Sequence, residues 1–131
     1  MPKGFRSKAE RRVYKLLRQA LPHTAIETEY FIKTEGMEGQ RLFFDLYLPT
    51  LQIAIEIQGD QHYEENYFFH GQEQVGEINF SNQKTRDRIK RELTEYGLGL
   101  VVLDYDDAMK ITSEELIKLI KKEVARRDTE I

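Results

Sequence analysis

Cysteine is absent from this chain. Without thiols the protein can form neither a disulfide framework nor a thiolate zinc site, which agrees with a reducing compartment. The chain also lacks a run of about 18 apolar residues that could cross a bilayer, and its basic N-terminus has no apolar segment of the kind that a secretory signal requires. We therefore expect a soluble intracellular protein that makes no use of a membrane.

An overall positive charge is missing as well. The net charge of -3 argues against a protein that coats nucleic acid non-specifically, because such proteins depend on a positive field. Basic residues instead gather in residues 1–20 and 84–91, on either side of an acidic middle. Such clusters can be solvated helix faces, but they also suit a metal-dependent enzyme that acts on a phosphate backbone. Charge alone leaves both readings open.

The order of the predicted elements indicates one α/β domain spanning residues 1–131. Periodicity and capping signals predict a helix from Ser7 to Pro22, strands at 26–32, 42–48 and 52–58, a long loop at 59–80, a helix at 81–96, a strand at 100–103 and a final helix opened by Thr112 and Glu115. This order predicts a mixed sheet of about four strands, a three-strand meander plus one further strand, flanked by helices.

Two acidic residues fall on the same face of successive predicted strands. In the strand 52–58 the isoleucines alternate toward the core, which leaves Glu56 and Gln58 on the opposite face. In the preceding strand the same alternation predicts a core face at Phe44 and the other even-numbered positions, with Asp45 on the far side. Asp45 and Glu56 are therefore expected to point the same way.

The hairpin between these strands limits the distance between the two acids. A two-residue loop would pair Asp45 with Ala54, and a four-residue loop would pair it with Glu56. Either register leaves the two carboxylates about 5 to 8 Å apart at Cβ, close enough for both to bind one Mg²⁺. The alternative is a solvated strand face that carries two acids by chance.

Three further residues are candidates for the same site, each with a simpler alternative. Glu10 continues the apolar stripe of Leu17 in the first helix, but it is also the residue that a capping box with Ser7 requires. His62 follows a turn directly after the Glu56 strand, where a loop can present a general base, although a single histidine is often a surface residue. By helical periodicity alone Asp87 would be solvated.

Three segments resemble a known nuclease superfamily. They are Phe44–Pro49 (FDLYLP), Ile55–Tyr63 (IEIQGDQHY) and Arg86–Lys90 (RDRIK). The resemblance is to the PD-(D/E)XK superfamily, and within it to the branch of very-short-patch repair endonucleases and phage homing endonucleases that carry a Glu, Asp, His, Asp signature. It runs from about Ser7 to Tyr105, and its strand-turn-strand part is more specific than its helical parts.

The resemblance implies a restriction-endonuclease-like core with a catalytic set of acids at a metal site. In it Asp45 and Glu56 hold Mg²⁺, for which Mn²⁺ can substitute, and Glu10 completes the acidic set. His62 and Asp87 would assist proton transfer or position the water. Five basic residues are expected to hold the DNA backbone: Lys84, Arg86, Lys90, Arg11 and Arg12.

Gln58 belongs to this catalytic set but departs from the superfamily pattern, because it stands where a lysine is usual. Glutamine carries no positive charge, so water activation would depend on the metal, on His62, or on a lysine from elsewhere such as Lys84 or Lys90.

We therefore expect a magnesium-dependent DNA endonuclease that hydrolyses phosphodiester bonds by nicking or by double-strand cleavage, in the cytoplasm of a bacterium or a phage-infected cell. Paired cuts in duplex DNA would indicate a homodimer. The main alternative is a catalytically inactive nuclease-fold module that binds DNA or a protein partner. An enzyme acting on RNA or a nucleotide has less support, because the sequence shows neither an aromatic single-strand platform nor a glycine-rich phosphate loop.

Overall fold

Four strands form one mixed sheet. The computed structural model describes residues 5, 7–33, 41–58 and 83–130, without the side chains of residues 29–33 and 41–42. The strands are β1 (Glu27–Lys33), β2 (Arg41–Leu48), β3 (Ile53–Gln58) and β4 (Gly99–Asp104), in the order β1-β2-β3-β4. β1, β2 and β3 are antiparallel neighbours, and β4 runs parallel to β3. The predicted meander with one further strand is confirmed.

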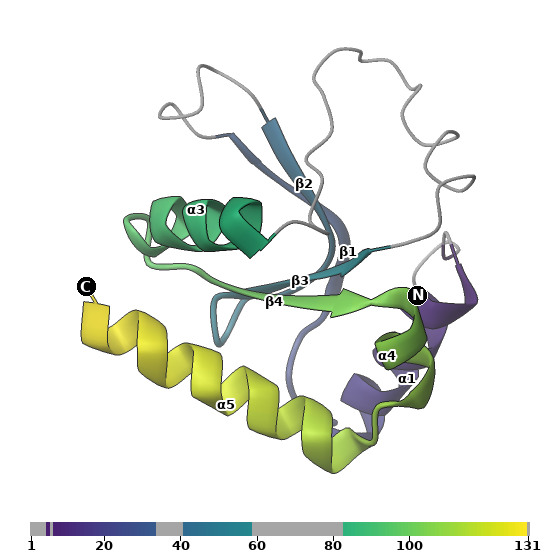
Figure 1. Cartoon of the computed structure of the whole chain (residues 1–131). Coiled ribbons are helices and arrows are strands. Elements are labelled where there is room, and N and C mark those ends of the chain that lie inside the picture. The colour runs from purple at the N-terminus through teal and green to yellow at the C-terminus, as the bar shows by residue number, and fades with distance from the viewer. Residues whose placement is uncertain (1–4, 6, 34–40, 59–82, 131) are drawn as a thin grey trace.

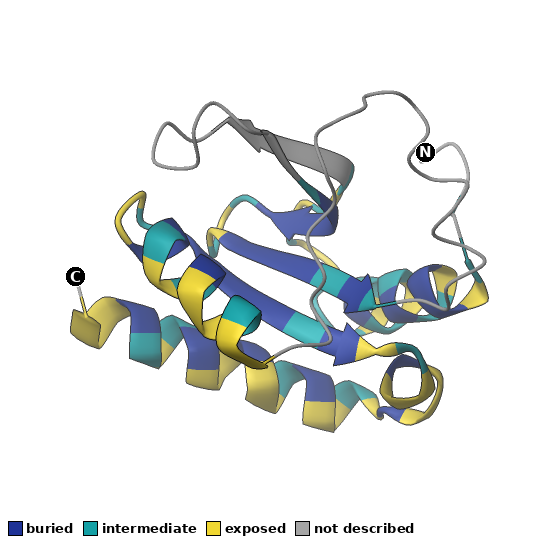
Figure 2. Ribbon diagram, turned by 45° about the horizontal axis from the view of Figure 1, so that its top comes forward, coloured by how far each residue is buried: buried dark blue, intermediate teal, exposed yellow. Residues whose placement is uncertain are grey.

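Helices cover both faces of the sheet (Figure 1). One face packs on α1 (Lys8–Ala20), α4 (Tyr105–Lys110) and α5 (Ser113–Glu130), and the other packs on α3 (Gln83–Thr94). β4 contributes to both cores, because Leu100 packs with α3 while Val101 and Leu103 pack with the other three helices. Figure 2 shows the strands buried between these layers and α5 exposed along its outer side. β4 is therefore covered on both faces.

Two helices begin at the capping residues that the sequence indicates. The Ser7 hydroxyl accepts a hydrogen bond from the Glu10 N–H (3.1 Å) at the start of α1. At the start of α5 the Thr112 hydroxyl accepts from the Glu115 N–H (3.1 Å), and the Glu115 carboxylate accepts from the Thr112 N–H (3.0 Å). These bonds satisfy backbone donors that have no partner within the helix.

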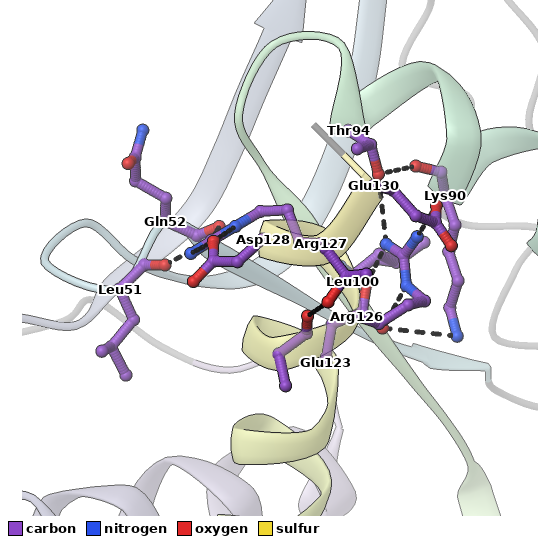
Figure 3. Close-up of polar contacts among 12 residues, drawn as sticks. Leu51, Gln52, Lys90, Thr94, Leu100, Glu123, Arg126, Arg127, Asp128 and Glu130 are labelled. Carbon is purple, nitrogen blue, oxygen red and sulfur yellow. Dashed lines mark hydrogen bonds and ion pairs between the residues drawn. The ribbon is translucent and has the colours of Figure 1, made fainter.

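The β2–β3 hairpin takes the longer of the two registers considered. Leu48 pairs with Ile53, so four residues, 49 to 52, form the loop. Gln52 closes it with a φ of 56°, and its N–H donates to the Pro49 carbonyl (3.3 Å). α5 holds this loop from outside, since Nη1 of Arg127 donates to the carbonyls of Leu51 (2.7 Å) and Gln52 (3.1 Å) (Figure 3).

β2 pairs with β3 only between residues 46 and 48, whereas it stays paired with β1 back to Arg41. The part of β2 that precedes Leu46 in the chain therefore turns away from β3, as Figure 1 shows. The prediction that Phe44 shares a core face with Leu46 and Leu48 is wrong, because Phe44 packs in the α3-side core. Alternation of side chains between the two faces of the sheet fails at Phe44 because β2 is no longer paired with β3 there.

Other expectations meet the structure in part. α4 was not predicted, because its six residues bury only Ala108 and show no readable period. The expected turn between β1 and β2 and the loop 59–80 lie outside the described residues, as does the start of the helix predicted from Ser81. In the described part of the chain, no helix combines the length and apolar character needed to span a bilayer.

Candidate functional site

Asp45 lies at the point where β2 and β3 separate. The last backbone pair between these strands is Leu46 with Ile55. One residue further, Oδ2 of Asp45 accepts a hydrogen bond from the Ile57 N–H (2.8 Å), so a carboxylate does what a strand carbonyl would otherwise do. The side chain is only 3% exposed. Asp45 is thereby fixed against the peptide bond that joins Glu56 to Ile57.

Glu56 occupies the adjacent position on β3. It directly precedes Ile57, whose N–H binds the Asp45 carboxylate. Ala54, two residues before Glu56 on β3, packs in the α3-side core. Because alternate residues of a strand share a face, Glu56 belongs to that same side of the sheet. Glu56 is half-buried. The structure thus brings the Asp45 carboxylate next to the backbone of Glu56.

Glu10 is buried in α1, on the side of the helix that carries Val13 and Leu17. Only 1% of it is exposed, and a buried carboxylate is unfavourable unless other groups compensate it. Its helix is joined to α4 through Arg12, whose Nη1 donates to the Ala108 carbonyl (2.8 Å). Since α4 directly follows β4, this contact places the N-terminal half of α1 near the carboxyl end of that strand.

Glu10, Asp45 and Glu56 do not together form a metal site with three protein ligands in the described part of the chain. Within residues 5, 7–33, 41–58 and 83–130, no group of three or more histidine, aspartate or glutamate side chains is arranged to hold a metal ion. Glu10 is therefore not gathered with Asp45 and Glu56 into such a group. Its role as a third ligand stays a prediction.

The remaining predicted catalytic residues are placed as follows. Gln58 ends β3, is half-buried, and has Asp104 of β4 as its register partner. Asp87 is exposed near the start of α3, where it accepts a hydrogen bond from Nε2 of Gln83 (3.0 Å). This agrees with the periodicity, which places Asp87 in solvent. His62 lies outside the described residues.

The five predicted DNA-binding cations divide into two groups. Arg11 and Lys84 are exposed. Arg12 binds the Ala108 carbonyl, Arg86 binds Asp104 (2.8 Å) and Lys90 lies 3.8 Å from Glu123.

Asp104 was not anticipated as a member of this region. The signal for it was present, because an acid directly follows the buried strand 100–103, and the carboxyl ends of parallel strands are where α/β proteins place ligands. Recognising it required knowing that this strand lies beside β3.

The chemistry of the donor set fits Mg²⁺. Asp45 and Glu56 supply carboxylate oxygens, which are hard ligands, and the chain contains no cysteine that would favour softer metals. Mg²⁺ is commonly held by one or two carboxylates together with waters and substrate phosphates. Two adjacent carboxylates are therefore sufficient protein ligands for this ion.

Comparison with known proteins gives limited matches. No protein-family model matches the chain. An uncharacterized protein, 033L of Invertebrate iridescent virus 3, is 35% identical over 68 residues, which is 51% of this chain and 33% of that protein. The matched part of the chain thus spans only 33% of the length of this viral relative. Among solved structures, the 5-hydroxymethylcytosine-specific restriction enzyme AbaSI is similar over 97% of this chain and 43% of its own, with 16% identity and a TM-score of 0.46.

Proposed function

We propose that this protein is a Mg²⁺-dependent DNA endonuclease. The observation that carries the proposal is the adjacency of Asp45 and Glu56 at the separation of β2 and β3, with Asp45 nearly fully buried. Two carboxylates at neighbouring positions disfavour each other's charge unless a cation or a proton neutralises one of them. A divalent cation bound between them would favour both charges and would also give the pair a chemical use.

The reaction is the hydrolysis of a phosphodiester. The oxygen of a water forms a bond to phosphorus, the bond from phosphorus to one sugar oxygen breaks, one water proton goes to that oxygen, and the other is taken up by a base. When bound, Mg²⁺ supplies Lewis-acid stabilisation of the developing charge and a lower pKa for the attacking water. Asp45 and Glu56 would hold and orient the ion, Glu10 would complete the acidic set, and His62 with Asp87 would move the proton or position the water.

Two observations support the rigidity that such a site needs. The Asp45 carboxylate is fixed by the Ile57 N–H, and β3 lies between β2 and β4 in the sheet. Ligands held by strands keep their geometry better than ligands on loops. The direction of the Asp45 side chain is therefore set before any substrate binds.

The test is nicking of supercoiled plasmid with Mg²⁺ or with EDTA. We expect metal-dependent nicking by the natural chain, and a loss of about 100-fold or more in rate for Asp45→Asn and for Glu56→Gln, which remove the ligand charge with little change of shape. Glu95→Gln, an exposed acid at the end of α3, is the matched control and should nick at the natural rate.

Metal binding can be measured without turnover. Titration calorimetry with Mn²⁺ should show a binding event that Asp45→Asn weakens and Glu95→Gln does not. Nicking that survives both Asp45→Asn and Glu56→Gln would remove the pair from the mechanism.

A second candidate function is favoured by Gln58. Because a neutral side chain stands where the resembled nucleases carry a lysine, the chain could be a binding module that no longer cuts. This reading predicts that plasmid, nicked and branched DNA all remain intact in Mg²⁺ and Mn²⁺, while a gel-shift experiment still shows a DNA complex. Labelled RNA in parallel reactions tests the remaining alternative, an enzyme that acts on RNA.

A further inference from the structure

At the carboxyl ends of β3 and β4, Asp104 lies next to Gln58. These strands are parallel, and Gln58 has Asp104 as its register partner. Neighbouring strands lie about 4.8 Å apart, so the two backbones are direct neighbours. Leu100 and Val102 of β4 pack with the α3-side core, and alternation places Asp104 on that same side.

α3 brings a cation to this point. Ile89 is fully buried between α3 and the sheet, and Arg86 precedes it by three residues, so both lie on the inward side of the helix. Nη2 of Arg86 is 2.8 Å from Oδ1 of Asp104, and the Arg86 side chain is only 19% exposed. Asp104, the strand neighbour of the residue that stands in place of the usual lysine, thus holds a guanidinium.

We propose that Arg86, oriented by Asp104, contacts the phosphate of the substrate and supplies the fixed positive charge that Gln58 cannot supply. This inference rests on the proposed nuclease function and adds to it a phosphate-binding cation and the residue that positions it. Asp104 is the positioning residue, because it acts through Arg86.

Arg86 suits this role better than the lysines nearby. Lys90 is directed to Glu123 of α5 (3.8 Å), and Lys84 is exposed at the start of the helix. A guanidinium has five N–H donors in a fixed plane, so it can bind a carboxylate and a phosphate oxygen together. It does not give up its proton near neutral pH, so its contribution is electrostatic and the base must be another group.

Stability alone does not explain the pair. The Asp104 side chain is 55% exposed, and ion pairs with so exposed a partner add little to stability. The α3–sheet core is supplied by Ile89 and Leu93. The ion pair therefore contributes mainly by fixing where the guanidinium lies.

The first test compares turnover numbers on plasmid DNA. We expect Arg86→Gln to lower kcat by about 100-fold, Arg86→Lys to recover part of this loss, and Asp104→Asn to lower kcat by about 10-fold. Arg88→Gln is the matched control, because Arg88 pairs with Glu92 (3.6 Å) and is exposed on α3. It should cut at the natural rate, and the melting temperature of each variant should change by less than about 5 °C.

The second test does not depend on cutting. Binding of a short duplex in EDTA is measured by fluorescence anisotropy at several salt concentrations. Loss of one phosphate contact should lower the slope of log K against log salt by about one unit in Arg86→Gln, and Arg88→Gln should leave it unchanged. A purely structural ion pair would leave the slope unchanged in both.

The outcomes separate this inference from the proposed function. If the natural chain cuts and Arg86→Gln keeps its kcat and its salt slope, the inference is wrong and the nuclease proposal stands. If the natural chain does not cut in Mg²⁺, the nuclease proposal fails together with the catalytic role of Arg86. A slope reduced in Arg86→Gln would then still identify Arg86 as a phosphate contact.

Discussion

Glu123 is a charged residue placed almost entirely inside the protein. It is 5% exposed, on the inward side of α5 with Leu116 and Ile120. Its carboxylate accepts the Leu100 N–H (3.0 Å) and is bound by Arg126 (2.6 Å) (Figure 3). A buried charge of this kind is tolerated because a counter-ion and a backbone donor compensate it.

We expect Glu123→Gln to lower the free energy of unfolding by about 2 to 3 kcal/mol, because it leaves the Arg126 charge without its buried partner. Urea denaturation measures the change. Glu130→Gln removes the other Arg126 ion pair (2.6 Å) at an exposed position, and it should cost less than about 1 kcal/mol. Equal losses in the two variants would mean that burial of Glu123 has no energetic weight.

Arg126 allows a prediction about pH. Its hydrogen bond to Glu123 raises the pKa of the guanidinium, the charges of Glu123 and Glu130 add to this, and desolvation opposes it. A pKa raised by folding gives stability that is fully present below the unfolded pKa and is lost only as pH rises through the folded one. The difference in unfolding free energy between the natural chain and Arg126→Gln should therefore stay constant from about pH 6 to 9. A difference that falls steadily across this range would contradict the assignment.

At the scale of elements, Gly99 sets how closely α5 approaches the sheet. A Cβ at this position would lie 2.7 Å from Cδ1 of Ile53 and 3.0 Å from Cγ of Glu123. Glycine is needed here because α5 and β3 both come close to the start of β4.

Gly99→Ala should accordingly lower the free energy of unfolding by about 1 to 3 kcal/mol through overpacking. Ile53→Val removes the Cδ1 atom that the new methyl group would meet. In a double-mutant cycle measured by urea denaturation, Gly99→Ala should therefore cost less in the Ile53→Val background than in the natural chain. Strict additivity would show that the collision with Ile53 is not the cause.

The elements with a clear period or a cap could be predicted from the sequence. The capping boxes at Ser7 and Thr112 mark the first turns of α1 and α5, and alternation identifies β2 and β3. Local pattern could not place Phe44, because its direction depends on where β2 leaves β3. It also could not show that Glu123 and Arg127 are buried, because each is held by a backbone group distant in the sequence, the Leu100 N–H for Glu123 and the Leu51 carbonyl for Arg127.

The Arg86–Asp104 pair was hidden for a related reason. Asp104 lies 18 residues from Arg86, and the two meet only because α3 packs over the strand that follows it. Strand alternation gives neighbours within a hairpin, whereas contacts across a helix crossover depend on the rotation of the helix about its axis. The β2–β3 hairpin was therefore predictable, whereas the contact between Arg86 and Asp104 was not.

At the scale of the whole molecule, positive charge is concentrated on the outer side of α1. Lys8, Arg11 and Lys15 follow one another at helical spacing, and all three are exposed. Glu10 lies on the buried side of the same helix. α1 thus presents a basic stripe outward, on a chain whose net charge is -3.

Replacing Lys8, Arg11 and Lys15 together by glutamine should weaken duplex binding by about 10- to 100-fold at moderate salt and lower the salt slope by about 1 to 3 units. Anisotropy titrations at several salt concentrations measure both. The control replaces Lys118, Lys121 and Lys122, which are exposed on α5, and so changes the net charge by the same amount. If both triple variants lose affinity equally, the attraction comes from net charge and not from the α1 stripe.

The hydrogen bonds from Arg127 to the carbonyls of Leu51 and Gln52 have a consequence for folding. Donor and acceptors are 75 and 76 residues apart in sequence, so the bond closes a long loop and cannot form early in folding. The hairpin turn and the last turns of α5 should therefore form late and open together. In native-state hydrogen exchange we expect their amides to belong to one cooperative unit, and Arg127→Met to speed exchange at Gly99, whose N–H shares the Gln52 carbonyl.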